Sequence, residues 1–188
     1  MTHADPVTWT DREFTGNDFR DEDLRGLHTQ RVVFDECDFS GANLSESEHR
    51  DSAFRNCRFD RATVWHSSFH NCSVMGSVFT RCRLRPVTFD QVDFTLAVLG
   101  GADLRGTDLT GCRLRDASLV DADLRKAVLR DADLSGVRAA GARLDDADLR
   151  GARIDPTLWT TTTLRGAKID IHQGLAFAAA HGLDVHGQ

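Results

Sequence analysis

The sequence predicts an all-β solenoid, a tube of short extended segments, on the strength of two periodic registers. Apolar residues, most of them large, recur at every fifth position from Trp9 to Ile169 without an insertion or deletion. Only Thr29 and His49 are polar there, and ten of the 11 phenylalanines lie on this register. We call the residues of this register the centres. Two residues before each centre, a second register holds only Ala, Cys, Ser, Thr, Val or Leu from residue 27 to 167. A period of five fits neither an α-helix nor a long strand. We therefore expect short extended segments joined by corners, with the residues of both registers pointing into the tube.

The corners and the number of sides follow from two further patterns. Glycine recurs two positions after the centre, as at Gly101, Gly106 and Gly111, and glycine tolerates the positive φ of a tight corner. Read with a period of 20, the centres form four columns, and the third begins with four phenylalanines: Phe19, Phe39, Phe59 and Phe79. The column that starts at Leu24 contains no phenylalanine. We therefore expect coils of 20 residues with four sides, named first to fourth from the units centred on Trp9, Phe14, Phe19 and Leu24.

Composition narrows the class of protein. The 188 residues suit a single domain, and no apolar run is long enough for a transmembrane helix. The start lacks the layout of a signal peptide, which predicts a cytoplasmic protein with reduced cysteines and no membrane contact. With 23 basic and 29 acidic residues, the net charge of -6 argues against direct binding of nucleic acid.

The sequence offers no arrangement typical of an enzyme or a metal site. All five cysteines lie in the small inward register, where packing is the favoured interpretation, although Cys37 and Cys57 would stack closely enough for a disulfide. His66 and His70 fall on different sides, and His49 faces inward. No GxSxG, HExxH or P-loop motif occurs. We expect no catalysis, no cofactor and no bound metal.

The C-terminal segment breaks the repeat. Residues 170–182 predict a helix that Asp170 caps and Gly182 ends. We therefore divide the chain into a repeat unit over 1–169 and a helix with its tail over 170–188. The helix either covers the open end of the tube or also joins two tubes tail to tail, and we favour the dimer. The expected dimer interface consists of Leu158, Trp159, Ile171, Leu175, Phe177, Ala178 and Leu183.

Charge is distributed unevenly over the four sides. Summed over their five-residue units, the first to fourth sides carry -3, -2, 0 and +1. Aspartate often directly precedes a centre, where its side chain can hydrogen-bond the backbone and hold the corner without any partner. That structural explanation covers most of these residues, but it leaves two adjacent acidic sides.

The units, such as ADLRG at 102–106, resemble the pentapeptide-repeat family, whose pattern is A(D/N)LXX. The resemblance covers residues 7–171. It implies a right-handed quadrilateral parallel β-helix with four pentapeptides per coil, here about eight coils, and a short C-terminal α-helix. At ~4.8 Å per coil, the tube would be about 38 Å long.

A closer resemblance is to the fluoroquinolone-resistance members of this family. It rests on the uninterrupted coils, on DFTLAVLGGADLRG at 93–106 and on LAFAAAHGL at 175–183. It implies a dimeric DNA mimic that binds DNA gyrase, modulates or inhibits it and protects it from fluoroquinolones, with a possible regulatory GTPase as a further partner. The alternative is a structural or scaffold solenoid that binds another protein by shape.

The gyrase contact is expected on the two acidic sides of the central and C-terminal coils. The residues selected are Asp90, Asp93, Asp108, Asp116, Asp131, Asp133 and Asp148.

Overall fold

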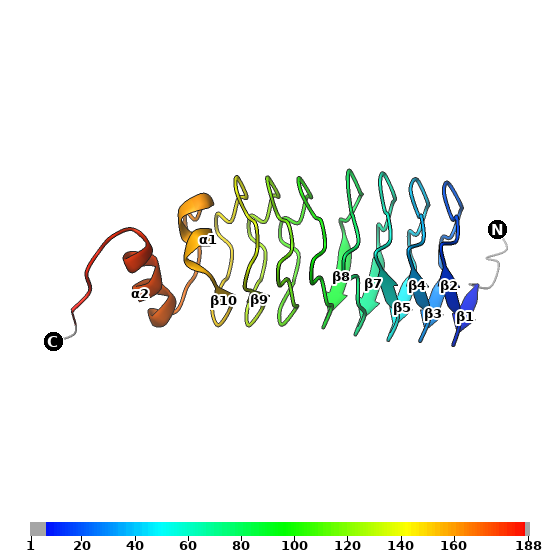
Figure 1. The fold of residues 1–188 in the computed structure, drawn as a ribbon, viewed down its shortest axis with the longest axis horizontal. Coiled ribbons are helices and arrows are strands. Elements are labelled where there is room, and N and C mark those ends of the chain that lie inside the picture. Colours follow the sequence, from blue (N-terminus) through cyan, green and yellow to red (C-terminus); the bar gives the residue numbers. More distant parts are fainter. Residues whose placement is uncertain (1–6, 187–188) are drawn as a thin grey trace.

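The computed structural model describes residues 7–186, so residues 1–6 and 187–188 of the two expected units lie outside it. The chain forms a rod of stacked coils with helices at its C-terminal end (Figure 1). The strands are β1 (Thr8–Thr10), β2 (Glu13–Thr15), β3 (His28–Gln30), β4 (Val33–Asp35), β5 (Glu48–Arg50), β6 (Ala53–Arg55), β7 (Ser67–His70), β8 (Val87–Asp90), β9 (Asp133–Leu134) and β10 (Arg153–Ile154). The helices are α1 (Pro156–Thr161) and α2 (Ile171–Ala180).

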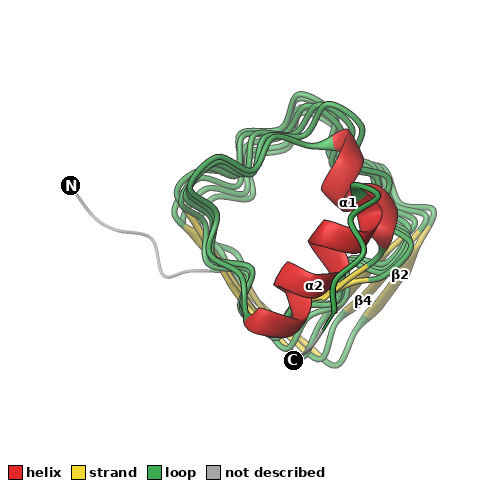
Figure 2. Ribbon diagram, turned by 90° about the vertical axis from the view of Figure 1, so that its left-hand side faces the viewer, coloured by secondary structure: helices red, strands yellow, loops and turns green. Residues whose placement is uncertain are grey.

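Every coil contains 20 residues, as the sequence predicts. Strands pair in parallel with a shift of 20, as in Thr8 with His28 and Phe34 with Phe54. The sheet β1-β3-β5-β7-β8 forms much of the first side, and β2-β4-β6 lies on the second. Isolated bridges continue this register to Lys168. Viewed along the rod, the superposed coils outline a four-sided tube (Figure 2).

The number of regular coils is about seven, against the expected eight. The difference arises at α1, which replaces the third side of the last coil. Pro156 stands in the first turn of α1, where its missing N–H costs no hydrogen bond and its fixed φ suits a helix. Register is nevertheless kept, because Arg143 still pairs with Thr163, 20 residues later.

Both inward registers fill the tube. The phenylalanines of the third side form a stack, with ring centroids 5.1 Å apart between Phe39 and Phe59 and 4.7 Å between Phe59 and Phe79. Leucine and alanine take over the same positions in the later coils and are also buried, as at Leu99, Leu119 and Ala139. Each coil buries its apolar surface only against its neighbours, so stacking supplies the stability of the rod.

The two polar exceptions on the centre register belong together. Thr29 and His49 occupy equivalent places in adjacent coils, and both are buried. The Thr29 hydroxyl lies 2.8 Å from His49 Nδ1, and the Ser47 hydroxyl lies 2.8 Å from His49 Nε2. Burial lowers the pKa of His49 to about 3. His49 is thus a neutral, fully hydrogen-bonded member of the core.

The C-terminal helix closes the tube, and Asp170 caps it as predicted. The Asp170 carboxylate accepts from Gln173 N–H, and the Gln173 side chain accepts from Asp170 N–H. The Gln173 amide also donates to the carbonyls of Leu149 and Ala152, at 2.7 and 2.8 Å. One buried side chain therefore starts α2 and satisfies backbone acceptors in the last coils.

The corner position two residues after each centre holds glycine and several other residue types. The corner glycines do have positive φ, for example 65° at Gly106. The same corner position also holds charged and polar residues with positive φ, including Asp116 and Asp131, both at 56°. Aspartate and asparagine tolerate this conformation better than most residues, which explains their frequency at these corners.

Candidate functional site

The aspartates that directly precede a centre take part in a local turn. Each carboxylate accepts a hydrogen bond from the backbone N–H two residues later, as in Asp108 from Thr110 at 2.9 Å and Asp103 from Arg105 at 3.2 Å. Asn43 does the same with Ser45. The structure thus supports the interpretation that this position holds the corner.

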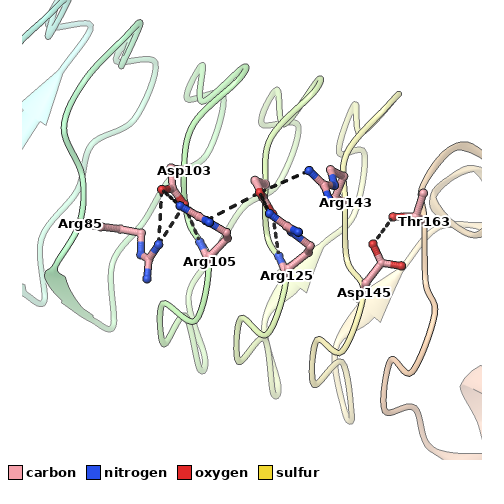
Figure 3. A network of polar contacts seen from close by, with 8 residues as sticks. Arg85, Asp103, Arg105, Arg125, Arg143, Asp145 and Thr163 are labelled. Carbon is pink, nitrogen blue, oxygen red and sulfur yellow. Dashed lines mark hydrogen bonds and ion pairs between the residues drawn. The ribbon is translucent and has the colours of Figure 1, made fainter.

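The residue two positions after the aspartate decides whether the turn keeps its negative charge. In one group this residue is arginine. For Asp18, Asp103, Asp123 and Asp148 the guanidinium of that arginine forms two further hydrogen bonds to the same carboxylate. Arg105 Nε and Nη2 donate to Asp103 at 2.8 and 2.7 Å, and Arg125 pairs likewise with Asp123. Figure 3 shows these pairs in successive coils of the fourth side. Hydrogen bonds from Arg105 hold the pKa of Asp103 well below its usual range. Here the turn is neutral overall.

In the other group the residue is serine or threonine, and no cation follows the carboxylate. The Thr110 hydroxyl donates to Asp108 at 2.6 Å, and the Ser135 hydroxyl donates to Asp133 at 2.6 Å. These hydroxyls support the turn but do not neutralise it. Asp108 lies on the first side and Asp93 and Asp133 on the second, whereas Asp38, which pairs in the same way with Ser40, lies on the third.

Four of the seven predicted contact residues are exposed aspartates without an arginine partner within residues 7–186: Asp90, Asp108, Asp116 and Asp131. The carboxylate of Asp90 lies 3.3 Å from His70 Nδ1. Asp90 and Asp108 line the same open groove of about 410 Å³ on the first side. The structure thus brings these two residues together, although they are 18 positions apart in the sequence.

The first side has a long stretch without a basic residue. Its units contain no lysine or arginine between Arg50 and Arg130. Asp51, Asp90 and Asp108 are the charged residues of this stretch. The acidic character of the first side is therefore concentrated in the middle of the rod.

Asp116 and Asp131 stand two residues after a centre, unlike the aspartates that directly precede one. Both occupy positive-φ corners, and each carboxylate extends over the glycine of the next coil, Gly136 or Gly151. A side chain at either glycine would collide with that carboxylate. Sequence reasoning missed this pairing, but its signal is readable as an aspartate followed 20 residues later by a glycine.

The other three predicted residues present less free charge. The Asp93 side chain is 16% exposed and lies 3.3 Å from Arg113. Asp133 is half-buried in its turn. Asp148 is buried between Arg130 Nε and Arg150 Nη2, each at 2.7 Å, and hydrogen bonds from these two arginines keep its pKa well below the usual range. Asp148 thus serves the structure of the rod.

The seven residues expected at a dimer interface also divide into two groups. Leu158 and Trp159 are buried in the chain itself, and Phe177 packs edge-on against Trp159 with centroids 5.9 Å apart. A second group faces outward: Ile171 is 82% exposed and Leu183 63%. Leu175 is exposed and Ala178 half-buried. Folding of α2 over the last coil removes the first group from the surface.

Other candidate chemistry finds little support in the described residues. Four of the five cysteines are buried and Cys82 is half-buried, and burial raises the pKa of the Cys57 thiol to about 12. Across residues 7–186, no three His, Cys, Asp or Glu side chains converge as metal ligands would. In the same range no helix combines the length and apolarity that crossing a membrane requires.

Known proteins resemble this chain in sequence and in fold. The sequence model described as "Pentapeptide repeats (8 copies)" matches residues 37–76, 77–116 and 117–154. The pentapeptide repeat protein MfpA of Mycobacterium tuberculosis is 70% identical over 95 residues, which are 50% of this chain and 52% of the relative. MfpA of Mycolicibacterium smegmatis is 69% identical over 65 residues, 35% of this chain and 34% of that protein. The chain therefore spans about half of the first relative's length and a third of the second's.

Solved structures share the fold at low sequence identity. HetL, a pentapeptide repeat protein of the cyanobacterium Nostoc, aligns with a TM-score of 0.68 at 18% identity and covers 87% of both chains. QnrB1, described as a plasmid-mediated fluoroquinolone resistance protein, aligns with a TM-score of 0.60 at 15% identity, over 96% of this chain and 98% of its own.

Proposed function

Because the chain belongs to the pentapeptide repeat family and is similar to MfpA, we propose that it binds DNA gyrase in place of DNA. The contact is made by the first and second sides of the rod, where aspartates face solvent. By occupying a surface that normally holds duplex DNA, the protein inhibits or modulates gyrase and protects it from fluoroquinolones. The fluoroquinolone link of QnrB1 supports this proposal only through a shared fold.

The observation that carries the proposal is the charge pattern of the first side. Asp90 and Asp108 are exposed, border one groove and lie within a stretch that contains no lysine or arginine. A protein surface that binds DNA is basic, and such a surface attracts exposed carboxylates in the same way. The rigid coils hold these carboxylates at fixed spacing, so little conformational entropy is lost on binding.

The resemblance to DNA is local. A rod of about seven coils at ~4.8 Å per coil is about 34 Å long, and B-DNA of that length carries about 20 charges. The formal net charge of this chain is -6. Imitation of every phosphate is therefore impossible, and the contact depends on a few carboxylates together with the shape of the rod.

We also propose that two rods join through their C-terminal ends. Ile171, Leu175 and Leu183 leave an apolar surface exposed on α2 and the residues after it. Replacing Ile171 and Leu175 by aspartate should give a monomer with an unchanged circular dichroism spectrum. Equilibrium sedimentation tests the dimer, and a monomeric wild-type protein at micromolar concentration would contradict it.

The gyrase contact is tested by inhibition of supercoiling. In one variant Asp90, Asp108, Asp116 and Asp131 become asparagine, which is isosteric. Asparagine already forms the turn of Asp108 at Asn43 and occupies a positive-φ corner at Asn56. In the matched control, four arginine-paired aspartates of the third and fourth sides become asparagine: Asp18, Asp60, Asp103 and Asp123. Both variants gain the same net charge.

We expect the first variant to lose at least tenfold in inhibition and the control to retain most of it. Equal losses in both variants would mean that only overall charge matters. Retained inhibition in both would favour a scaffold that binds by shape. Pull-downs with separate gyrase fragments at two salt concentrations identify the subunit, and the same assay with a GTPase tests the regulatory partner.

A further inference from the structure

The corner between the fourth and first sides carries a row of basic residues on an otherwise acidic rod. Arg85, Arg105 and Arg125 occupy the same place in three successive coils, and Lys126 follows the last of them. With Gly106 and Asp146, these side chains line an open groove of about 560 Å³. Figure 3 shows the three arginines side by side along the rod. We call Arg85, Arg105, Arg125 and Lys126 the basic row.

The basic row keeps unused hydrogen-bond donors although aspartates support it. Arg105 and Arg125 bind Asp103 and Asp123 through Nε and Nη2, which leaves Nη1 of each free of these contacts. Arg85 uses Nη1 for Asp103. Lys126 forms no ion pair with any residue of the described range 7–186. The aspartates therefore hold the guanidinium groups in place while part of each remains available for a ligand.

The two ends of the basic row define its length. In the preceding coil the same place is taken by Trp65, which is 46% exposed. In the following coil it is taken by Asp145, with Asp146 beside it at the end of the groove. Tryptophan and arginine are the residue types most enriched at the centres of protein–protein contacts. A long polyanion would meet Asp145 and Asp146, whereas a short acidic segment would not.

The spacing of the three arginines indicates whether a helix or a strand of a partner fits the basic row. Successive coils lie ~4.8 Å apart, so the three arginines extend over about 10 Å. A helix parallel to the rod presents side chains at i, i+3 and i+7 over about 10.5 Å. An extended strand places three residues of one face over about 13 Å. A helix therefore places three carboxylates opposite the three arginines more closely than a strand does.

We propose that the basic row is a docking site for an acidic helix of a protein partner, with Trp65 as its apolar anchor. This corner borders the acidic first side along one edge, and the proposal does not depend on the gyrase contact.

Fluorescence anisotropy with a labelled helical peptide tests the proposal. The probe is an alanine–glutamine helix with glutamates at i, i+3 and i+7, and its isomer carries the same glutamates spread around the helix. We expect the one-faced peptide to bind more tightly than the isomer, with binding weaker at about 300 mM than at about 50 mM salt. Oligothymidylate of similar length tests single-stranded nucleic acid.

Replacing the basic row by glutamine should weaken binding of the one-faced peptide about tenfold, and Trp65→Ala should weaken it severalfold. The control replaces Arg55, Arg115 and Arg138, which are exposed on the second and third sides, and should leave binding unchanged. If the basic-row variant is unstable, Lys126→Glu alone should still weaken binding. Equal binding of both peptides, insensitivity to these changes, or tighter binding of oligothymidylate through the same residues would overturn the proposal.

Discussion

The first and fourth sides of the rod use the same turn and end with opposite surface character. On the fourth side Asp103 and Asp123 are each followed two residues later by arginine, which binds the carboxylate in a bidentate pair. On the first side Asp108 is followed by Thr110, whose hydroxyl supports the turn and leaves the charge. The backbone needs the carboxylate in both cases. For Asp103 and Asp108, the residue two positions later therefore decides whether the structural aspartate also becomes part of a charged surface.

The two sides differ inside the tube as well. The fourth side has only aliphatic centres, whereas the first side contains Thr29 and the neutral His49. Burial lowers the pKa of His49 to about 3, against about 6.5 in the unfolded chain. Below pH 6.5 the unfolded state binds a proton that the folded state does not, so stability falls as the pH falls towards 3.

The largest expected effect follows from this internal difference. His49→Phe should remove the loss of folding stability that His49 causes at acid pH, because phenylalanine does not titrate. Phenylalanine is also the residue at the same place in the next coil. The free energy of unfolding of the variant relative to the wild type should rise by about 2 kcal/mol between pH 8 and pH 5. Urea denaturation at the two pH values measures it. A pH-independent difference would mean that the pKa of His49 is the same in the folded and unfolded states, and would contradict the burial of a neutral His49.

The second prediction compares corners on two sides. Gly136→Ala on the second side places a methyl group at positive φ and in collision with the Asp116 carboxylate. Gly106→Ala on the fourth side has the same φ problem, but nothing lies within 4 Å of the new atom. We expect a loss of about 1 kcal/mol at Gly106 and about 2 kcal/mol at Gly136, measured by urea denaturation. Equal losses would show that Asp116 does not extend over the next coil.

The smallest effect on stability is expected from a change on the fourth side that alters the pKa of Asp103. Arg105→Thr gives Asp103 the same follower as Asp108 and removes the hydrogen bonds that hold its pKa well below the usual range. The pKa of Asp103 should rise towards its ordinary value, measured by carboxyl NMR, with little change in stability because the pair is exposed. An unchanged pKa would assign the shift to Arg85 or to the backbone.

Much of the fold could be predicted from the periodic pattern. The register of five identifies the inward residues, the phenylalanine column indicates coils of 20, and Asp170 with Gly182 marks the last helix. These features depend on local conformation and on contacts between coils at a constant separation. The helix α1 and the hydrogen bonds from Gln173 to Leu149 and Ala152 depend on how the end of the chain folds back, which no periodicity describes.

The candidate site was predictable only in part, for a related reason. The side of each aspartate follows from its number, and so do the acidic first and second sides. Burial of Asp148 results from Arg130 and Arg150 converging on it from two coils. Burial of Trp159 results from the packing of Phe177 on it. Both are contacts of particular side chains, which the charge sum of a side cannot reveal.

The central claim is that the position of the free carboxylates, at constant composition and charge, determines the gyrase contact. A variant with Thr95→Arg, Thr110→Arg, Arg105→Thr and Arg125→Thr exchanges the two kinds of turn between the sides and keeps the net charge of -6. Its inhibition of gyrase supercoiling, compared with the wild type at equal concentration, is the most direct test. We expect a loss of at least tenfold with an unchanged circular dichroism spectrum. Full inhibition by the exchanged variant would contradict it.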